Sequence, residues 1–334
     1  MSTDASTRVA PAAPGSLPVA LGPLGYGVAA LGNLYQAVPD EVWPECVPAA
    51  WEAGIRYFDV APHYGLGLAE ERLGAALAGR PRDEFVVSTK VGRVLEPNPG
   101  HAGESDIHNL FDVPATRRRV LDYSRDGVLR SLEGSLQRLG LDRIDLLLVH
   151  DPDDHVEEAL AGAFPALDEL RSEGVIGAYG AGMNQSAALT RFVRETDLDV
   201  VMVAGRYTLL DRSAADDLLP AALERGVGVI AAAVFNSGLL ATDRPSATAR
   251  FDYGAVPDAV LTRAHRIADV AERNGLRLPE LAAQFPLRHP AVSTVVIGAA
   301  SPGQITANAG LLDSLVPESV WAELEHEGLL DAIL

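Results

Sequence analysis

The sequence predicts a single (β/α)8 barrel, an α/β fold in which eight parallel strands alternate with helices. Short runs of apolar and β-branched residues alternate along the chain with longer stretches of helical periodicity. Parallel strands need crossover connections, so repeated strand–helix units indicate a parallel sheet. Eight such units can be counted in the 334 residues, and eight units close naturally into a barrel that forms one domain.

The predicted strands are short apolar runs. Ile144–His150 is the clearest, because a nearly unbroken apolar run is typical of a strand that is buried on both faces. The first strand is the least distinct and is expected close to Gly27. In order along the chain, the strands are expected at residues 27–31, 55–60, 85–91, 144–150, 175–180, 200–204, 227–233 and 294–297.

Helices are predicted where apolar residues recur at intervals of three and four positions. In the stretch 124–139 they fall at Val128, Leu132, Leu136 and Leu139, which places them on one face of a helix. In order along the chain, the helices are expected at residues 41–53, 69–77, 124–139, 156–171, 187–194, 216–225, 259–274, 279–288 and 304–312.

An open, doubly wound sheet is the alternative to the barrel. Its dinucleotide-binding fingerprint, Gly-x-Gly-x-x-Gly after the first strand, is missing from this sequence. Gly22, Gly25 and Gly27 lie near the first strand, but their spacing is wrong and no acidic residue follows at the expected place. The sequence therefore favours the barrel.

Composition and charge narrow the classes of function. The formal net charge of −19 repels nucleic acid and anionic lipid, and no uninterrupted apolar run is long enough to predict a membrane span. Cys46 is the only cysteine, which excludes an internal disulfide and is compatible with a reducing cytoplasm. We therefore expect a cytoplasmic protein that acts on a small molecule, with residues 1–17 as a flexible tail and residues 18–334 as the barrel.

Three consecutive predicted strands end in ionisable residues. Asp59 ends the second strand, Lys90 the third and His150 the fourth, and Tyr64 follows in the loop after Asp59. The C-terminal ends of the strands of a barrel surround one mouth, so these four side chains are expected to meet there. A single Asp or Lys at a strand end is often part of a structural ion pair, but the joint occurrence of all four indicates an active site.

These four residue types suit hydride transfer to or from a carbonyl carbon. A tyrosine hydroxyl can take or give the accompanying proton, but its ordinary pKa of about 10 is too high for a good base near neutrality. We expect Lys90 to lower the pKa of Tyr64 and Asp59 to offset the cost of burying Lys90. His150 would form a hydrogen bond with the substrate oxygen and so orient the reacting carbon.

One segment interrupts the alternation of strands and helices. Residues 92–123 are rich in proline and glycine and follow the C-terminal end of the third strand, which is the end where barrels form their active sites. A segment of this length without predicted structure is usually functional or disordered. The fold is therefore expected to carry a long loop after its third strand.

Two segments resemble the signature of the aldo-keto reductases. The first is GIRYFDVAPHYG at 54–65 with AEERLG at 69–74, and the second is SLQRLGLDRIDLLLVH at 135–150. The match extends from about residue 25 to residue 308. The resemblance implies a general acid/base at Tyr64 with supporting roles for Asp59, Lys90 and His150. It also implies that NAD(P) is bound without a Rossmann fold, with the nicotinamide at the mouth of the barrel.

The resemblance also indicates which residues contact the cofactor. Many relatives hold the carboxamide with Ser-Asn and Gln. Here Asn184, with Met183 before it, stands in for Ser-Asn, and Ala204 occupies the position of the Gln. Residues 235–240 resemble the loop that covers the pyrophosphate, with a plain tight turn as the alternative. The implied cofactor residues are Asn184, Asn236, Ser237, Gly238, Leu240, Gly298, Ala299, Ser301, Gln304 and Asn308.

The end of the chain indicates a preference for NAD over NADP. Relatives that prefer NADP usually carry Lys and Arg after the eighth strand, where these cations pair with the 2′-phosphate. Gly298 and Gln304 occupy those two positions here. Replacing both cations removes the charge-assisted contacts that a phosphate needs.

Residues 92–95 and 122–133 are similar to one branch of the family, which holds L-fucose and D-threo-aldose 1-dehydrogenases and pyridoxal 4-dehydrogenase. This similarity implies that the anomeric hydroxyl of an aldose is oxidised to a lactone, or that a cyclic hemiacetal of pyridoxal is oxidised. A general aldehyde or ketone reductase and a cofactor-binding sensor subunit remain as alternatives. Within the long loop, the candidates for bonding sugar hydroxyls are His101, Asp106, His108 and Asp112, unless this loop is a solvated, mobile lid.

Overall fold

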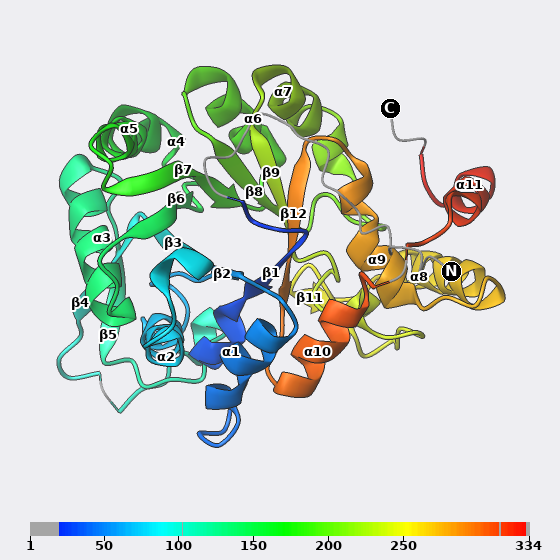
Figure 1. Ribbon diagram of the computed structural model, residues 1–334, viewed down its shortest axis with the longest axis horizontal. Helices are drawn as coiled ribbons and strands as arrows, with labels where there is room; N and C mark the ends of the chain where they lie inside the picture. Colours follow the sequence, from blue (N-terminus) through cyan, green and yellow to red (C-terminus); the bar gives the residue numbers. More distant parts are fainter. Residues whose placement is uncertain (1–19, 102, 314, 332–334) are drawn as a thin grey trace, which may run out of the picture.

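The structure is a computed structural model that describes residues 20–101, 103–313 and 315–331. The predicted tail, residues 1–17, lies outside the described residues. Eight parallel strands close into a barrel, as predicted: β1 (Leu24–Gly27), β2 (Tyr57–Asp59), β3 (Val86–Val91), β6 (Ile144–His150), β7 (Ile176–Met183), β8 (Val200–Ala204), β9 (Gly228–Ala232) and β12 (Val292–Gly298). Their order around the barrel is β1, β12, β9, β8, β7, β6, β3, β2 (Figure 1).

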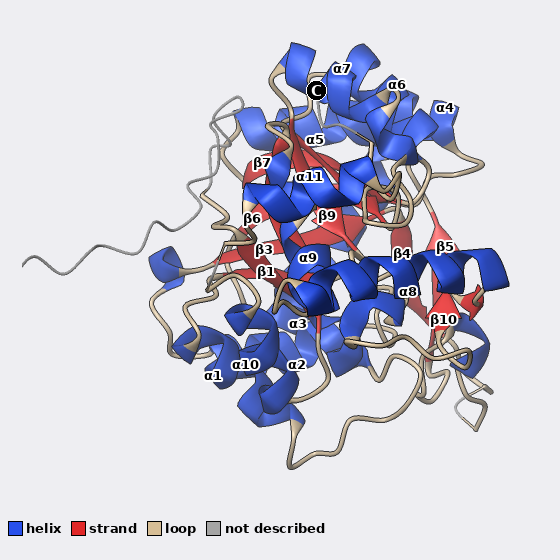
Figure 2. Cartoon of the chain, turned by 90° about the vertical axis from the view of Figure 1, so that its right-hand side faces the viewer, coloured by secondary structure: helices blue, strands red, loops and turns tan. Residues whose placement is uncertain are grey.

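Helices surround this barrel (Figures 1 and 2). α3 illustrates how the sequence forms them, because Ser124 caps its first turn by accepting a hydrogen bond from the backbone N–H of Gly127. At its other end Gly140 adopts the left-handed conformation. The helices are α1 (Trp43–Glu52), α2 (Leu68–Leu77), α3 (Arg125–Leu139), α4 (Val156–Glu158), α5 (Phe164–Ser172), α6 (Ser186–Glu195), α7 (Leu218–Arg225), α8 (Asp258–Arg273), α9 (Leu278–Gln284), α10 (Pro302–Gly310) and α11 (Glu318–His326).

The hydrophobic core has two layers, because successive side chains of a strand point to opposite faces. In β6, Leu147 and Val149 face the helices, whereas Leu146 and Leu148 face the barrel interior. The interior cluster consists of Leu21, Tyr57, Leu146, Leu148, Ala178, Val200, Met202, Ile230 and Val296. The same alternation carries His150, two positions beyond Leu148, toward the interior at the mouth of the barrel.

Two predicted elements differ from the structure. The first strand is Leu24–Gly27 and not residues 27–31, because residues 28–32 form a 3-10 helix that leads away from the barrel. The single helix predicted for 156–171 is divided by a π-helical turn at Ala159–Ala163. Pro165 lies in the first turn of the following helix, α5. Since proline has no N–H to donate, a wider turn accommodates it there.

The long segment after the third strand is confirmed in its position, but it is not irregular throughout. Its two ends form an antiparallel ribbon of β4 (Arg93–Pro97) and β5 (Arg117–Leu121), with Arg93 opposite Leu121 and Pro97 opposite Arg117. A second ribbon, β10 (Arg250–Phe251) with β11 (Gly254–Ala255), lies between β9 and α8. Both ribbons follow the C-terminal ends of barrel strands.

Within the described part of the chain, no helix is both long enough and apolar enough to cross a lipid bilayer.

Candidate active site

The four predicted catalytic side chains meet at the mouth of the barrel. Asp59 ends β2, and its register partner on β3 is Ser88. Lys90 lies two residues further along β3, so its side chain shares the inward face with Ser88. His150 ends β6, and Tyr64 lies in the loop that follows β2. Neighbouring strands therefore supply three of the four groups.

Lys90 connects the carboxylate to the phenol. Its ammonium lies 2.9 Å from both carboxylate oxygens of Asp59 and 3.2 Å from the hydroxyl of Tyr64, and it also donates to the carbonyl of Val60 at 3.0 Å. Asp59 in turn accepts a hydrogen bond of 2.7 Å from Ser88. Lys90 is 2% exposed, so a single buried ion pair holds the phenol in place.

Burial dominates the titration of the phenol in this structure. Burial alone would lower the pKa of Lys90, but the Asp59 carboxylate and then Tyr64 raise it above its ordinary value. Burial raises the pKa of Tyr64 to about 12, although the charge of Lys90 acts to lower it. The sequence analysis predicted correctly that Lys90 acts to lower the pKa of Tyr64. It was wrong about the overall shift of this pKa, which is upward. Asp59 compensates the charge of Lys90 and also acts to raise the pKa of Tyr64.

Two imidazole rings lie beside the phenol. The ring of His150 is 5.9 Å from that of Tyr64, and the ring of His63 is 5.6 Å from that of His150, each in an edge-on arrangement. Burial, followed by the charge of Lys90, lowers the pKa of His150 well below its ordinary value. Burial and the charge of Arg119 lower the pKa of His63 to about 2. Both rings are therefore neutral near neutral pH, and a neutral imidazole has a hydrogen-bond donor to offer a substrate oxygen.

His63 is a site residue that the sequence analysis did not select. Its position directly before Tyr64 was the available signal. Its ring also packs against Phe111, at 5.3 Å, and its carbonyl accepts a hydrogen bond of 2.7 Å from Arg119. The segment after β3 thus contacts the wall of the site next to the phenol.

The polar residues of that segment have different environments. Asp106 is 3% exposed and forms an ion pair with Arg119 at 2.6 Å, so its carboxylate is already occupied by a buried guanidinium. The structure does not present Asp106 as a free ligand for sugar hydroxyls. The other three candidates are exposed: His101 contacts Glu104, His108 contacts Asn109, and Asp112 extends from the loop beside Asn33.

A second ion pair at the mouth was also not predicted. Asp151 directly follows His150, and its carboxylate lies 3.0 Å from Arg93 and 3.4 Å from Nε2 of His150. An acidic residue one position beyond a strand-end histidine was the signal in the sequence. Its partner could not be found in this way, because Arg93 is 58 positions away.

The predicted pyrophosphate loop after β9 has an unusual backbone. Asn236, Ser237 and Gly238 have φ values of 47°, 58° and 92°, a region that residues other than glycine rarely adopt. Asn236 is 4% exposed, and its Oδ1 has no hydrogen-bond partner within the described residues. An unpaired buried amide oxygen next to a left-handed turn suits a loop that binds a polar ligand. Leu240 is fully buried, and its N–H already donates to the carbonyl of Phe235.

Asn184 directly follows β7, and its side chain is already hydrogen-bonded. Its Nδ2 donates to the carbonyl of Ala204 at 2.9 Å, and the side chain of Tyr253 lies close to it. Tyr253 lies in the turn between β10 and β11, where Asp252 and Tyr253 both have positive φ values, 48° and 64°. Positive φ at both central residues is typical of a two-residue hairpin, but the usual pair is Asn-Gly or Asp-Gly, so the sequence Asp-Tyr did not reveal this turn.

The predicted residues after β12 lie at the mouth next to the β9 loop, since β12 pairs with β9. Ser301 caps α10 by accepting from the backbone N–H of Gln304. The side-chain oxygen of Gln304 accepts from the backbone N–H of Ala300 at 2.7 Å, and Asn308 donates to the carbonyl of Gly298 at 3.4 Å. Ala299 is buried, and its carbonyl accepts from Tyr26. These contacts fix the start of α10, a position suited to bind an anionic or hydroxylated group.

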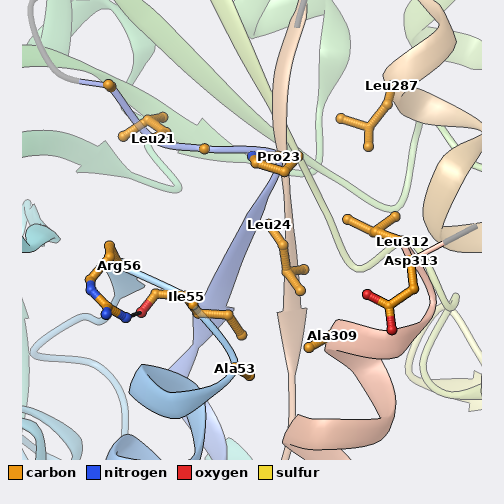
Figure 3. A pocket seen from close by; sticks show the side chains of 13 residues that line it. Leu21, Pro23, Leu24, Ala53, Ile55, Arg56, Leu287, Ala309, Leu312 and Asp313 are labelled. Carbon is orange, nitrogen blue, oxygen red and sulfur yellow. Dashed lines mark hydrogen bonds between the residues drawn. The ribbon is translucent and has the colours of Figure 1, made fainter. Parts of the chain in front are cut away.

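A hollow of about 680 Å³ lies at the opposite end of the barrel (Figure 3). Its lining comes from the start of β1 and the segments that precede β1, β2 and β12, and from the end of α10 and the residues that follow it. The charged residues of this lining are Arg56 and Asp313, and Arg56 already donates to the carbonyls of Trp51 and Ile55. The N-terminal face of a barrel usually contributes to stability, so the chemistry belongs to the mouth.

Comparison with known proteins assigns this chain to a family. The sequence model described as "Aldo/keto reductase family" matches residues 23–327. The chain is 50% identical to D-threo-aldose 1-dehydrogenase of Pseudomonas sp., over 97% of this chain and 98% of that protein. It is 40% identical to pyridoxal 4-dehydrogenase of Microbacterium luteolum, over 92% and 94%. Among solved structures, the holo form of an aldo-keto reductase from Bacillus halodurans superposes with a TM-score of 0.71 at 26% identity, covering 93% of each chain.

Proposed function

Because the chain belongs to the aldo/keto reductase family, it is an NAD(P)-dependent oxidoreductase that acts on CH–OH groups, and we propose that it oxidises the anomeric hydroxyl of an aldose to a lactone. One observation carries the proposal: Lys90 lies 3.2 Å from the hydroxyl of Tyr64 in a chain that is 50% identical to a D-threo-aldose 1-dehydrogenase. A phenol held beside an ammonium is suited to exchange a proton with a sugar hydroxyl.

Tyr64 is the general base of the proposed reaction. The O–H proton of the anomeric hydroxyl passes to the phenolate oxygen, the carbon–oxygen double bond forms, and the C–H bond breaks with its electron pair. When bound, an oxidised nicotinamide cofactor supplies the acceptor for this hydride. Lys90 stabilises the phenolate, and Asp59 holds Lys90 in position through two contacts of 2.9 Å.

His150 orients the substrate oxygen. Its ring is buried, neutral and 5.9 Å from the ring of Tyr64, so it has an N–H donor to offer the substrate oxygen. A donor and a base on the same oxygen fix the direction in which the C–H bond points. In the direction of reduction, the same two groups would polarise and protonate a carbonyl oxygen.

The β9 loop and the start of α10 are the proposed cofactor site. The unpaired Oδ1 of Asn236 and the left-handed turn at Ser237 and Gly238 support this assignment. Asn184 would hold the carboxamide after exchanging its contact with Tyr253. The residues that would complete the site are Leu240, Gly298, Ala299, Ser301, Gln304 and Asn308.

NAD is the proposed cofactor. Gly298 and Gln304 are uncharged, and the Gln304 oxygen is occupied by the backbone N–H of Ala300. Neither residue offers the cation that a 2′-phosphate requires. The kcat/KM values for NAD and NADP with one aldose test this directly, and a strong preference for NADP would refute it.

A substrate screen tests the proposed activity. Formation of NADH would be measured with L-fucose, D-arabinose, L-galactose, further aldoses and pyridoxal, with Tyr64→Phe as the inactive control. We expect turnover of at least one aldose that depends on Tyr64. Binding of NAD without turnover of any sugar, aldehyde or pyridoxal would instead indicate a cofactor-binding sensor.

Oxidation of pyridoxal is the second candidate. The 40% identity to a pyridoxal 4-dehydrogenase favours it, and the cyclic hemiacetal of pyridoxal presents the same kind of hydroxyl to Tyr64. The screen separates the two candidates by their kcat/KM values. A general aldehyde reductase would instead show a higher kcat/KM with NADPH and simple aldehydes.

We also infer a cytoplasmic location, which the free, buried thiol of Cys46 supports.

A further inference from the structure

Asp151 has a backbone conformation that points to a function. Its φ is 41°, a region in which non-glycine residues are uncommon and often occur at functional sites. The surrounding structure holds it there: its N–H donates to the carbonyl of Gly182 at 3.1 Å, and its carbonyl accepts from Tyr123 at 2.9 Å. The hydroxyl of Tyr123 also donates to the carbonyl of His150. The strand end is thus fixed on both sides.

Arg93 and Asp151 together offer open hydrogen-bonding positions at the mouth. Arg93 donates to Oδ2 of Asp151 at 3.0 Å, and among the described residues no donor contacts Oδ1. The two side chains are 22% and 25% exposed, so a ligand can reach them. Oδ2 lies 3.4 Å from Nε2 of His150, which places the pair beside the group that orients the reacting oxygen.

The three cations beside Tyr64 and His150 are each paired with a carboxylate. Lys90 is paired with Asp59, Arg93 with Asp151, and Arg119 with Asp106. The imidazoles of His63 and His150 stay neutral, because burial and these cations lower their pKa values. Each of the three cations therefore already has a carboxylate, and none is left to neutralise a phosphate or carboxylate on a substrate.

We propose that Asp151 and Arg93 bind the hydroxyl group on the carbon next to the reacting carbon of an uncharged, polyhydroxylated substrate. This proposal rests on the proposed oxidation of an aldose and names the part of the substrate that the site recognises. The substrate hydroxyl donates to the carboxylate of Asp151 and accepts from the guanidinium of Arg93. Hydrogen bonds to charged groups are strong, and a site built around a hydroxyl rejects analogues that lack it.

Two substrates that differ in one hydroxyl test the proposal. D-Arabinose and 2-deoxy-D-ribose differ only at the second carbon, which carries a hydroxyl in the first and none in the second. We expect the wild-type kcat/KM to be higher for D-arabinose by roughly 10- to 100-fold, which corresponds to one hydrogen bond to a charged group. In Asp151→Asn the kcat/KM for D-arabinose should fall by a similar factor, while that for 2-deoxy-D-ribose changes little. If another aldose is the faster substrate, its own 2-deoxy counterpart replaces this pair.

Asn is the suitable replacement, because Asn and Asp adopt positive φ more readily than other side chains. Asp153→Asn is the matched control, since it removes the same charge from an exposed residue two positions away. An equal loss on both substrates in Asp151→Asn would show a structural role and overturn the proposal, as would a wild-type enzyme that does not distinguish them. An enzyme that oxidises no aldose would contradict the proposed function itself, whereas an active enzyme with an unchanged ratio contradicts only the role of Asp151.

The charge argument has a separate test in the direction of reduction. Wild-type enzyme should reduce D-glyceraldehyde with a higher kcat/KM than glyceraldehyde 3-phosphate. Asp151→Asn leaves Arg93 without its carboxylate, so this preference should become smaller. A wild-type preference for the phosphorylated aldehyde would contradict an uncharged substrate.

Discussion

The ammonium of Lys90 lies 3.2 Å from the hydroxyl of Tyr64. Two opposing effects act on that hydroxyl. Burial raises its pKa to about 12, and the charge of Lys90 acts in the other direction. Burial prevails because Asp59 compensates the charge of Lys90 at 2.9 Å. The phenol is therefore protonated near neutral pH, which prepares it to act as an acid in reduction and makes it a base only as the pH rises.

The rate of oxidation should therefore depend on pH. Oxidation requires the phenolate form of Tyr64, so kcat/KM should rise about tenfold per pH unit between about pH 6 and pH 9. Reduction requires the protonated form and should be nearly constant over the same range. Initial rates in both directions across this range measure the effect. An oxidation rate that does not change with pH would contradict the assignment of the base.

The two histidines beside the phenol should make the protein sensitive to acid. Their pKa values are lowered in the folded protein, so below about pH 6.5 the unfolded chain takes up protons that the folded chain does not. The free energy of unfolding should then fall as the pH falls, by about 1.4 kcal/mol per pH unit for each histidine.

His63→Phe isolates one of these contributions, because an aromatic ring can pack against Phe111 in its place. Urea unfolding at several pH values below about pH 6 should give a shallower pH dependence for this variant, by about 1.4 kcal/mol per unit. The exposed His108→Phe is the matched control. Equal slopes for wild type and His63→Phe would contradict a neutral His63.

Asp106 should contribute to stability and not to substrate binding. Asp106→Asn leaves the guanidinium of Arg119, 10% exposed in the ion pair, without its carboxylate. Breaking a buried pair in this way costs about 3–5 kcal/mol, so the melting temperature should fall clearly. Asp112→Asn, at an exposed residue of the same segment, should change stability by only about 0.5 kcal/mol. A stable Asp106→Asn enzyme with a raised KM for aldose would restore the substrate role that the sequence suggested.

Cations introduced after β12 should change the cofactor preference. A side chain fits at Gly298, since a Cβ there would come no closer than 3.7 Å to the carbonyl of Gly27. Gly298→Lys with Gln304→Arg should raise kcat/KM for NADP about tenfold or more, because a charge-assisted hydrogen bond to phosphate becomes possible. The ratio of kcat/KM for NADP to that for NAD should rise as well. An unaltered NADP value would place the 2′-phosphate site elsewhere.

The barrel, and the meeting of the four proposed catalytic side chains at its mouth, could be predicted because both follow from local patterns. Each of Asp59, Lys90 and His150 ends an apolar run, and parallel strands bring such ends to one mouth. The first strand was misplaced because Leu24–Gly27 is only four residues long and contains two glycines. The ribbon of β4 and β5 was missed because its polar strands pair across the intervening loop. The helix break before Pro165 could have been inferred from the proline itself.

The missed part of the site depends on contacts between distant residues. Arg93 and Asp151 are 58 positions apart, and Asn184 contacts Tyr253 across the mouth. No local periodicity encodes such pairs. The direction in which the pKa of Tyr64 shifts could not be predicted either. The sequence indicates which charges are near the phenol, but not how deeply the phenol is buried.

The rate of Tyr64→Phe tests the central claim most directly. The variant removes one hydroxyl and keeps the ring that packs beside Phe111 and His150. Its kcat for oxidation of the preferred substrate should fall by about 10²–10⁴-fold, while the Kd for the cofactor, measured by protein fluorescence, stays within about twofold of wild type. A Tyr64→Phe enzyme that binds cofactor normally and retains most of the wild-type kcat would contradict the account.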